Sequence, residues 1–161
     1  MTMALRRTTT RHFDSLEQEA YLSLWRTYDR LRSLEEECFA VWELTAQQYN
    51  VLRLLKASYP EPVPTLSLVS RLVSRAPDVT RMLDKLEQRK LITRRKRKTD
   101  RRSVLVGITP AGLDLLSLIS VPLQQCHHQQ LGHLNGSDLK KLIELLNIAR
   151  QPHEPPGSPW R

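Results

Sequence analysis

Apolar residues recur every three or four positions over the first third of the chain, which is the spacing of one face of an α-helix. The first such stretch runs from Phe13 to Trp42 and predicts a helix of about 25 residues. A second helix should follow Thr45, whose hydroxyl can cap it. That helix must stop at residues 59–64, because the prolines there cannot continue it.

A similar pattern returns at the other end of the chain. Thr109 is placed to cap a long helix that begins at Pro110, and Pro122 inside this helix predicts a kink. The Asn-Gly pair at 135–136 predicts a turn, after which Ser137 should cap the last helix. The apolar face of that last helix consists of Leu139, Leu142, Ile143, Leu146 and Ala149.

Two shorter helices are expected between these long segments. The first runs from Thr65 to about Leu72, and residues 74–77 then form a brief turn, with Pro77 in the first turn of the next helix. One side of this next helix is apolar, with Val79, Met82, Leu83 and Leu86. Its other side is polar, with Thr80, Arg81, Asp84, Lys85 and Gln88. The pair therefore predicts a helix-turn-helix, whose second helix can enter a DNA major groove.

Two strands should follow, from Leu91 to about Arg95 and from Ser103 to Ile108. A β-hairpin directly after a helix-turn-helix is a wing, so the predicted fold is mainly α with a small β-hairpin wing. The segment 94–102 carries seven basic residues against one acidic residue. A positive tip between two strands is typical of a protein that binds a polyanion.

Composition narrows the class of protein further. The 161 residues are 40% hydrophobic and 26% charged, with a net charge of +8, as expected for one globular unit. No apolar run approaches the roughly 18–20 residues that span a bilayer, and no apolar segment follows Met1. Two cysteines are too few for a disulfide scaffold. We therefore expect a cytoplasmic protein without membrane contact.

Several segments together carry a recognisable pattern: Leu68–Leu72, Val79–Glu87, Leu91-Ile92, Asp100-Arg101-Arg102 and Ile108–Gly112. This pattern resembles the MarR family of bacterial transcription regulators. The resemblance implies a winged-helix homodimer whose first and last helices interlock. It also implies binding to pseudo-palindromic promoter DNA, commonly released by a small ligand or by oxidation. One departure is Lys90, which stands where the family usually has glycine, so Lys90 must adopt a left-handed conformation or end the helix differently.

The predicted domain organisation has three parts. Residues 1–12 form a disordered basic extension, residues 13–150 a MarR-type domain, and residues 151–161 a disordered proline-rich tail. Within the domain, the winged helix-turn-helix covers about 45–109. The dimerisation helices cover about 13–42 and 110–150.

Candidate DNA-binding residues fall in two groups. Those of the recognition helix, placed to reach base edges and phosphates, are Arg75, Pro77, Asp78, Thr80, Arg81 and Lys85. The alternative for Arg81 is an ion pair with Asp84 or Asp78. Those of the wing are Arg94, Arg95, Lys96, Arg97, Lys98, Asp100, Arg101 and Arg102. The residues from Arg94 to Lys98 should contact phosphates. In the family's motif the acid, here Asp100, orients an arginine, and Arg102 reaches into the minor groove.

Other candidate sites are weaker. Trp25, Tyr28 and Trp42 could line an effector pocket, although aromatic residues at helical spacing are more often core. His127, His128 and His133 lack the spacing of metal ligands on one helix face, so we expect no metal site. Cys38 is expected to be an inert buried thiol. Nothing in the sequence forms a catalytic arrangement, and we expect neither an enzyme nor a cofactor.

The leading hypothesis is a homodimeric, sequence-specific regulator that binds double-stranded DNA, more often a repressor than an activator, with a small molecule as candidate effector. The alternative is a winged-helix adaptor for RNA or protein partners that does not recognise promoters. A basic wing fits both hypotheses, because phosphate contacts carry no sequence information.

Overall fold

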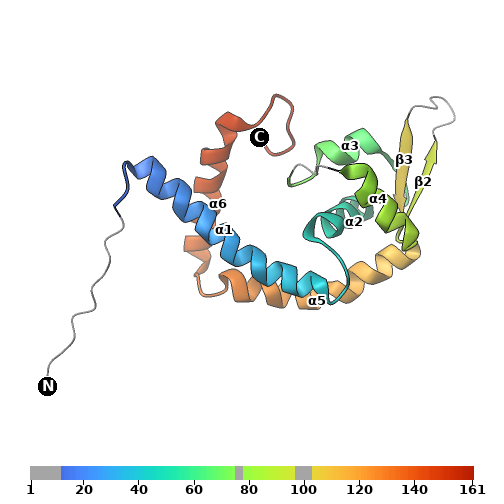
Figure 1. Cartoon of the computed structure of the whole chain (residues 1–161), viewed down its shortest axis with the longest axis horizontal. Coiled ribbons are helices and arrows are strands. Elements are labelled where there is room, and N and C mark those ends of the chain that lie inside the picture. Colours follow the sequence, from blue (N-terminus) through green and yellow to red (C-terminus); the bar gives the residue numbers. More distant parts are fainter. Residues whose placement is uncertain (1–11, 75–77, 97–102) are drawn as a thin grey trace, which may run out of the picture. The chain divides into compact units, whose positions relative to one another are not determined.

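The computed structural model describes residues 12–74, 78–96 and 103–161 (Figure 1). The helices are α1 (Leu16–Ala40), α2 (Ala46–Ser58), α3 (Thr65–Ser70), α4 (Val79–Gln88), α5 (Pro110–Leu131) and α6 (Gly136–Arg150). The strands are β1 (Val63–Pro64), β2 (Ile92–Lys96) and β3 (Val104–Ile108). A mainly helical chain with a small antiparallel sheet confirms the predicted fold class.

The chain divides into two units, residues 1–33 and residues 34–161. The first unit contains the N-terminal part of α1, which starts where Ser15 Oγ accepts the Gln18 N–H at 3.2 Å. The predicted first helix is confirmed, and it is shorter than 13–42 at both ends. The predicted extension before it, residues 1–12, lies outside the described residues except for His12.

The second unit holds the core. Thr45 caps α2 as predicted, and Gln48 bonds back to the Thr45 N–H, which completes a capping box. The inward face of α2 packs with α3, α4 and β3. The largest fully buried side chains are Phe39, Val51, Leu52, Leu55, Leu68, Leu86, Ile92, Val106 and Ile119. They come from α1, α2, α3, α4, β2, β3 and α5, so these elements share one core.

The sheet has three strands, in the order β1-β3-β2. Strands β2 and β3 form the expected antiparallel hairpin, with Ile92 opposite Ile108 and Lys96 opposite Val104. Strand β1 was not predicted, because two residues ending in proline carry no strand pattern of their own. It exists through its pairing with β3, where Val63 lies opposite Val106.

The link between α3 and α4 differs from the predicted short turn. Helix α3 ends at Ser70, two residues early, and α4 begins at Val79 with Asp78 as its N-cap. The predicted helix start at Pro77 is therefore wrong, while Pro77 itself lies outside the described residues. The Asp78 carboxylate accepts a hydrogen bond from the Arg81 N–H at 2.9 Å and so caps α4. Proline has no side-chain acceptor and could not form such a cap.

The C-terminal helices bring one further correction. Thr109 caps α5 and Pro110 is its first residue, as predicted, and the helix continues through Pro122 to Leu131. Helix α6 is capped by Asn135 and not by Ser137, because the Asn135 side chain accepts the Asp138 N–H at 2.9 Å.

The tail expected to be disordered contains a 3₁₀ turn, Gln151–His153. The Arg150 guanidinium lies 3.4 Å from the Glu154 carboxylate and 6.0 Å from the Trp160 ring centre. These contacts tie residues 154–160 back to the end of α6, which the proline content alone did not indicate. In the described part of the chain, no helix is long and apolar enough to cross a membrane.

Candidate nucleic-acid interface

Helix α4 has one buried face and one exposed face. Met82, Leu83 and Leu86 are buried in the core, as the sequence predicted. The exposed face carries Thr80, Arg81 and Lys85. Among the described residues, no carboxylate forms an ion pair with Arg81, so the pairing with Asp84 or Asp78 considered as an alternative is not formed. The guanidinium of Arg81 is therefore available to a ligand.

Asp78 lies at the start of this face. Because its carboxylate caps α4, its position is explained by helix stability without any DNA contact. Arg75 and Pro77, the other expected contacts at this end, lie outside the described residues.

The C-terminal end of α4 is fixed by its backbone. Lys90 has φ of 59° and so adopts the left-handed conformation, which was one of the two outcomes expected for a lysine at a position where glycine is usual. The Leu91 N–H bonds to the Leu86 carbonyl at 3.0 Å, and the Lys90 N–H bonds to the Glu87 carbonyl at 2.8 Å. This pair of bonds is a Schellman motif. The helix therefore ends as a glycine-terminated helix would, but with lysine.

Two further contacts hold this end of α4 to its neighbours. The Arg89 guanidinium donates to the carbonyls of Glu43 at 2.8 Å and Trp42 at 3.0 Å, just beyond α1. The Thr109 hydroxyl, at the start of α5, donates to the Lys90 carbonyl at 2.7 Å. Sequence reasoning missed Arg89, because nothing in the local pattern indicates a carbonyl partner 46 residues away.

The hairpin places its basic residues in two environments. Arg95 and Lys96 are exposed, which leaves them available to phosphates. Arg94 turns to α4, where its Nη2 lies 2.5 Å from Asp84 Oδ1 and 2.6 Å from Glu87 Oε2. The hydrogen bond to Glu87 and the two carboxylate charges raise the pKa of Arg94, against the opposing effect of burial. The Arg94 guanidinium is thus bound to α4, whereas we had expected it to contact phosphate like its neighbours.

The expected tip of the wing lies outside the described residues: Arg97, Lys98, Asp100, Arg101 and Arg102. Their roles remain predictions from the sequence.

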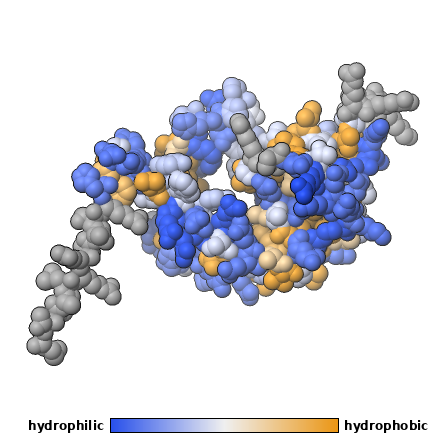
Figure 2. Space-filling model, viewed as in Figure 1, coloured by the Kyte–Doolittle hydropathy of each residue, from blue (hydrophilic) through white to orange (hydrophobic). Residues whose placement is uncertain are grey.

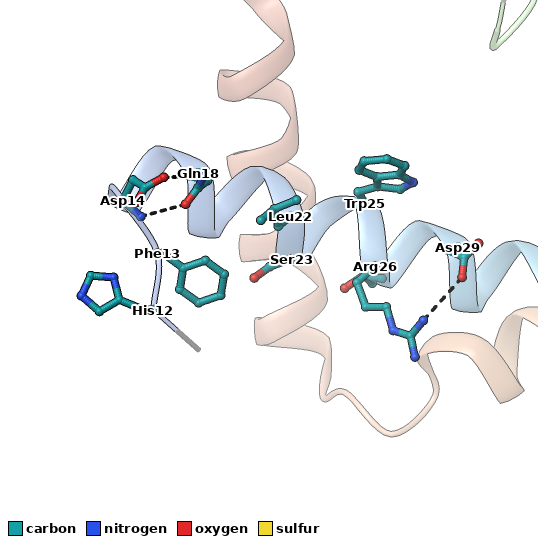
Figure 3. A pocket seen from close by; sticks show the side chains of 10 residues that line it. His12, Phe13, Asp14, Gln18, Leu22, Ser23, Trp25, Arg26 and Asp29 are labelled. Atoms are coloured by element: carbon teal, nitrogen blue, oxygen red, sulfur yellow. Dashed lines mark hydrogen bonds and ion pairs between the residues drawn. The ribbon is translucent and has the colours of Figure 1, made fainter. Parts of the chain in front are cut away.

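The three aromatic residues of the candidate effector pocket belong to different units: Trp25 and Tyr28 lie in the first unit and Trp42 in the second. Trp25 and Tyr28 are each 60% exposed on α1, so they are not core either. Trp25 lines an open pocket along α1, together with Phe13 and Leu22 (Figure 3). The Trp25 ring also lies 6.1 Å from that of Tyr21. Tyr28 is not among the residues that line this pocket, and Trp42 packs against the core of the second unit.

The cysteines form part of the core near the junction of α1 and α5. Cys126 is buried, whereas Cys38 is only half-buried, which departs from the expected buried thiol. Burial, and to a smaller degree the neighbouring Cys38, raises the pKa of the Cys126 thiol. A raised pKa disfavours the reactive thiolate. Within residues 12–74, 78–96 and 103–161, no cluster of histidine, cysteine or carboxylate side chains could hold a metal ion.

The chain is similar to known proteins in both sequence and fold. A model of the MarR family matches residues 44–104, from the end of the α1–α2 loop to the first residue of β3. A comparison with curated protein sequences gives no significant match. The crystal structure of a MarR transcription factor from Planctomyces limnophilus is 51% identical, with a TM-score of 0.68. The match covers 85% of this chain and 99% of that one.

Two more distant structures share the fold. BpsR of Bordetella bronchiseptica, whose DNA binding is regulated by 6-hydroxynicotinic acid, is 25% identical over 81% of this chain and 98% of its own, with a TM-score of 0.73. A MarR mutant from E. coli, crystallised with operator DNA, is 22% identical over 84% of this chain and 98% of its own, also with a TM-score of 0.73. Given the identity and coverage of the Planctomyces structure, the chain belongs to the MarR family of transcription regulators.

Proposed function

We propose that the protein binds double-stranded DNA in a sequence-specific manner and regulates transcription rather than catalysing a reaction. The observation that carries this proposal is the exposed face of α4. Thr80, Arg81 and Lys85 are exposed on this face, and the neighbouring hairpin is basic. We take α4 as the recognition helix and the β2–β3 hairpin as the wing. Helix α4 is capped by Asp78 and held at its C-terminal end by Arg89 and by Thr109, so it presents its side chains with little loss of freedom on binding.

The residues have different tasks in this proposal. Arg81 is placed to bind guanine through O6 and N7, and Thr80 to contact a thymine methyl or a phosphate. Arg95 and Lys96 contact phosphates, which strengthens binding to any duplex. The residues assigned from the sequence alone complete the proposed interface. Arg75 is placed for base edges and phosphates, and Arg97 and Lys98 contact phosphates. Asp100 orients an arginine, and Arg102 reaches into the minor groove.

We further propose that the protein acts in the cytoplasm as a homodimeric repressor on a pseudo-palindromic operator. Residues 45–109 are the reading lobe, and the helices within 13–42 and 110–150 supply the dimer contacts. The E. coli relative crystallised with operator DNA supports the type of partner, since the fold is shared. The Bordetella relative supports a small-molecule effector.

The test is a selection from random genomic fragments with the purified protein, followed by binding to the selected site and to random duplex. A sequence reader should prefer its site by ~10³-fold or more at physiological salt. Equal affinity for all duplexes, or a preference for folded RNA, would overturn the proposal in favour of an adaptor.

Two variants separate the proposed tasks. Arg81→Ala should cost about 1–3 kcal/mol on the selected site and relax the preference at one base pair. Arg95→Ala should weaken selected and random duplexes alike and lower the salt slope by about 1. If Arg95→Ala changes base preference while Arg81→Ala weakens all duplexes equally, the two elements have been assigned wrongly.

A further inference from the structure

We infer that Arg94 is a positioning residue that locks the wing to the recognition helix, and that it does not contact DNA. The inference rests on the proposed function, because it concerns how two DNA-reading elements are held together. It sets Arg94 apart from Arg95 and Lys96, which follow it in the same strand and have the same charge.

The contacts form a three-residue network across two elements. Asp84 and Glu87 are three positions apart on α4, so their carboxylates project from the same face of the helix. The Arg94 guanidinium donates from Nη2 to both carboxylates and from Nε to Glu87 Oε2 at 2.9 Å. Because a guanidinium is planar and its donors are fixed, this fork sets an orientation and not only a distance.

Glu87 also binds the backbone of the strand. Its Oε1 accepts the Arg94 N–H at 3.1 Å, while its Oε2 accepts from the side chain of the same residue. One carboxylate thus holds both the main chain and the side chain of β2. A rotation of β2 about its own axis would break one of these bonds, so the pairing resists twisting of the wing against α4.

Burial makes this network stronger than an ordinary surface ion pair. The Arg94 side chain is 24% exposed, against 45% for Asp84 and 38% for Glu87. An isolated surface pair contributes little because water screens it and both side chains lose freedom. Here the arginine is largely withdrawn from water, and two carboxylates share it.

Charge points to the same role. Two carboxylates on the recognition helix would repel phosphates, and Arg94 offsets part of that charge. A guanidinium that has given its donors to Asp84 and Glu87 has few left for DNA. Fixing the wing in advance also lowers the entropy lost when both elements engage DNA together.

The decisive variant is Glu87→Gln, because the two roles predict different changes in the preference for the selected site. If Arg94 positions the wing, Glu87→Gln should lower the preference for the selected site on the order of tenfold, even though it removes a negative charge near DNA. If Arg94 instead contacts phosphate, Glu87→Gln should free it, raise affinity for selected and random duplexes alike and leave the preference for the selected site unchanged. The latter result would overturn the inference.

Arg94→Met and Arg95→Met form the matched pair. Arg95→Met should lower the salt slope by about 1 and leave the preference for the selected site unchanged. The double variant Glu87→Gln/Arg94→Met has the net charge of the wild type, so its salt slope should be unchanged while its preference falls as in Glu87→Gln. A drop of about 1 in the salt slope of this double variant would show that Arg94 meets phosphate, and the inference would fail.

A measurement on the free protein keeps the inference separate from the proposed function. Urea unfolding of the wild type, Glu87→Gln, Arg94→Met and the double variant should give a positive coupling between Glu87 and Arg94 without DNA. Additive effects would overturn the inference. A wild-type protein without any site preference would instead overturn the proposed function, while the coupling could still be measured.

Discussion

Single residues decide how the recognition helix ends and how closely α5 can approach the base of the wing. Lys90 adopts φ of 59°, a conformation that costs a residue with a side chain roughly 1–2 kcal/mol relative to glycine. The two Schellman hydrogen bonds, at 2.8 and 3.0 Å, require the left-handed conformation at Lys90. The strain at Lys90 therefore accompanies the termination of α4 at this position. Because the strain lies in the backbone of Lys90, a glycine at this position should relieve it and keep both hydrogen bonds.

Lys90→Gly should raise the free energy of unfolding by about 1 kcal/mol, since glycine adopts this conformation at no steric cost. Urea unfolding at neutral pH measures the change. The control is Gln88→Gly, two residues earlier and still helical, which should lower stability by about 1 kcal/mol. Equal destabilisation by both substitutions would contradict the assigned backbone conformation.

Gly112 shows the opposite case, a glycine required by space. A Cβ atom there would lie 2.4 Å from the Leu91 carbonyl oxygen and 2.7 Å from Ile108 Cγ1. Glycine at this position allows the first turn of α5 to pack directly against the base of the wing. Backbone atoms cannot move aside as a flexible side chain can, so any larger residue must displace α5.

Gly112→Ala should therefore lower the free energy of unfolding by about 1–3 kcal/mol, although alanine is the better helix former. Gly136→Ala is the matched control, because nothing lies within 4 Å of a Cβ atom at that position. The control should be neutral or stabilising by up to about 1 kcal/mol. Thermal unfolding of both variants distinguishes the two sites, and a stable Gly112→Ala protein would refute the close approach.

At the scale of elements, helix starts are set by which polar side chain reaches the free N–H groups. Thr45 and Thr109 are each followed by a helix and have no competing neighbour, and both act as N-caps. Before α6 two candidates stand close together, Asn135 and Ser137, and only one can cap. Asn135 does so, which makes Gly136 and Ser137 the first helical residues.

Asn135→Ala should lower stability by about 1 kcal/mol, whereas Ser137→Ala should change it by no more than about 0.5 kcal/mol. Circular dichroism during urea unfolding gives both values. The reverse order of effects would show that the helix starts two residues later than described.

At the scale of the whole molecule, exposed apolar side chains on the end helices call for a partner. No described residue of the first unit is buried, although it contains Leu16, Leu22, Leu24 and Trp25. Helix α6 contains no buried residue either, and Ile143, Leu145 and Ile148 are each more than half exposed. Figure 2 shows such apolar surface near the start of α1. Monomers rarely leave this much apolar surface in water.

We expect sedimentation at low micromolar concentration to give a dimer rather than a species near 18.7 kDa. Ile143→Glu/Ile148→Glu should shift the population to monomer while the reading lobe stays folded, because a charge in an apolar interface is costly. Leu66→Glu is the control, since Leu66 is 84% exposed on α3, outside the proposed dimer helices, and its substitution should leave the mass unchanged. A folded wild-type monomer would exclude the dimer.

Much of this protein could be predicted from local pattern. The long helices, the caps at Thr45 and Thr109, the hairpin and the buried face of α4 all follow from spacings of a few residues, and all are present. Even the strain at Lys90 was one of two expected outcomes, because the helix had to end there. These features need only the backbone geometry of neighbouring residues, which the sequence specifies directly.

Tertiary structure decided what depends on distant partners. Strand β1 exists because β3 pairs with it, and Gly112 is required because Leu91 and Ile108 come within contact of it. The sequence shows one basic run at Arg94, Arg95 and Lys96. In the structure Arg94 binds Asp84 and Glu87, whereas the two residues that follow it are exposed. Sequence determines the charge of a side chain, but the position of the facing helix determines which opposite charge it meets. For that reason the basic wing was predictable as a whole, and the separate role of Arg94 was not.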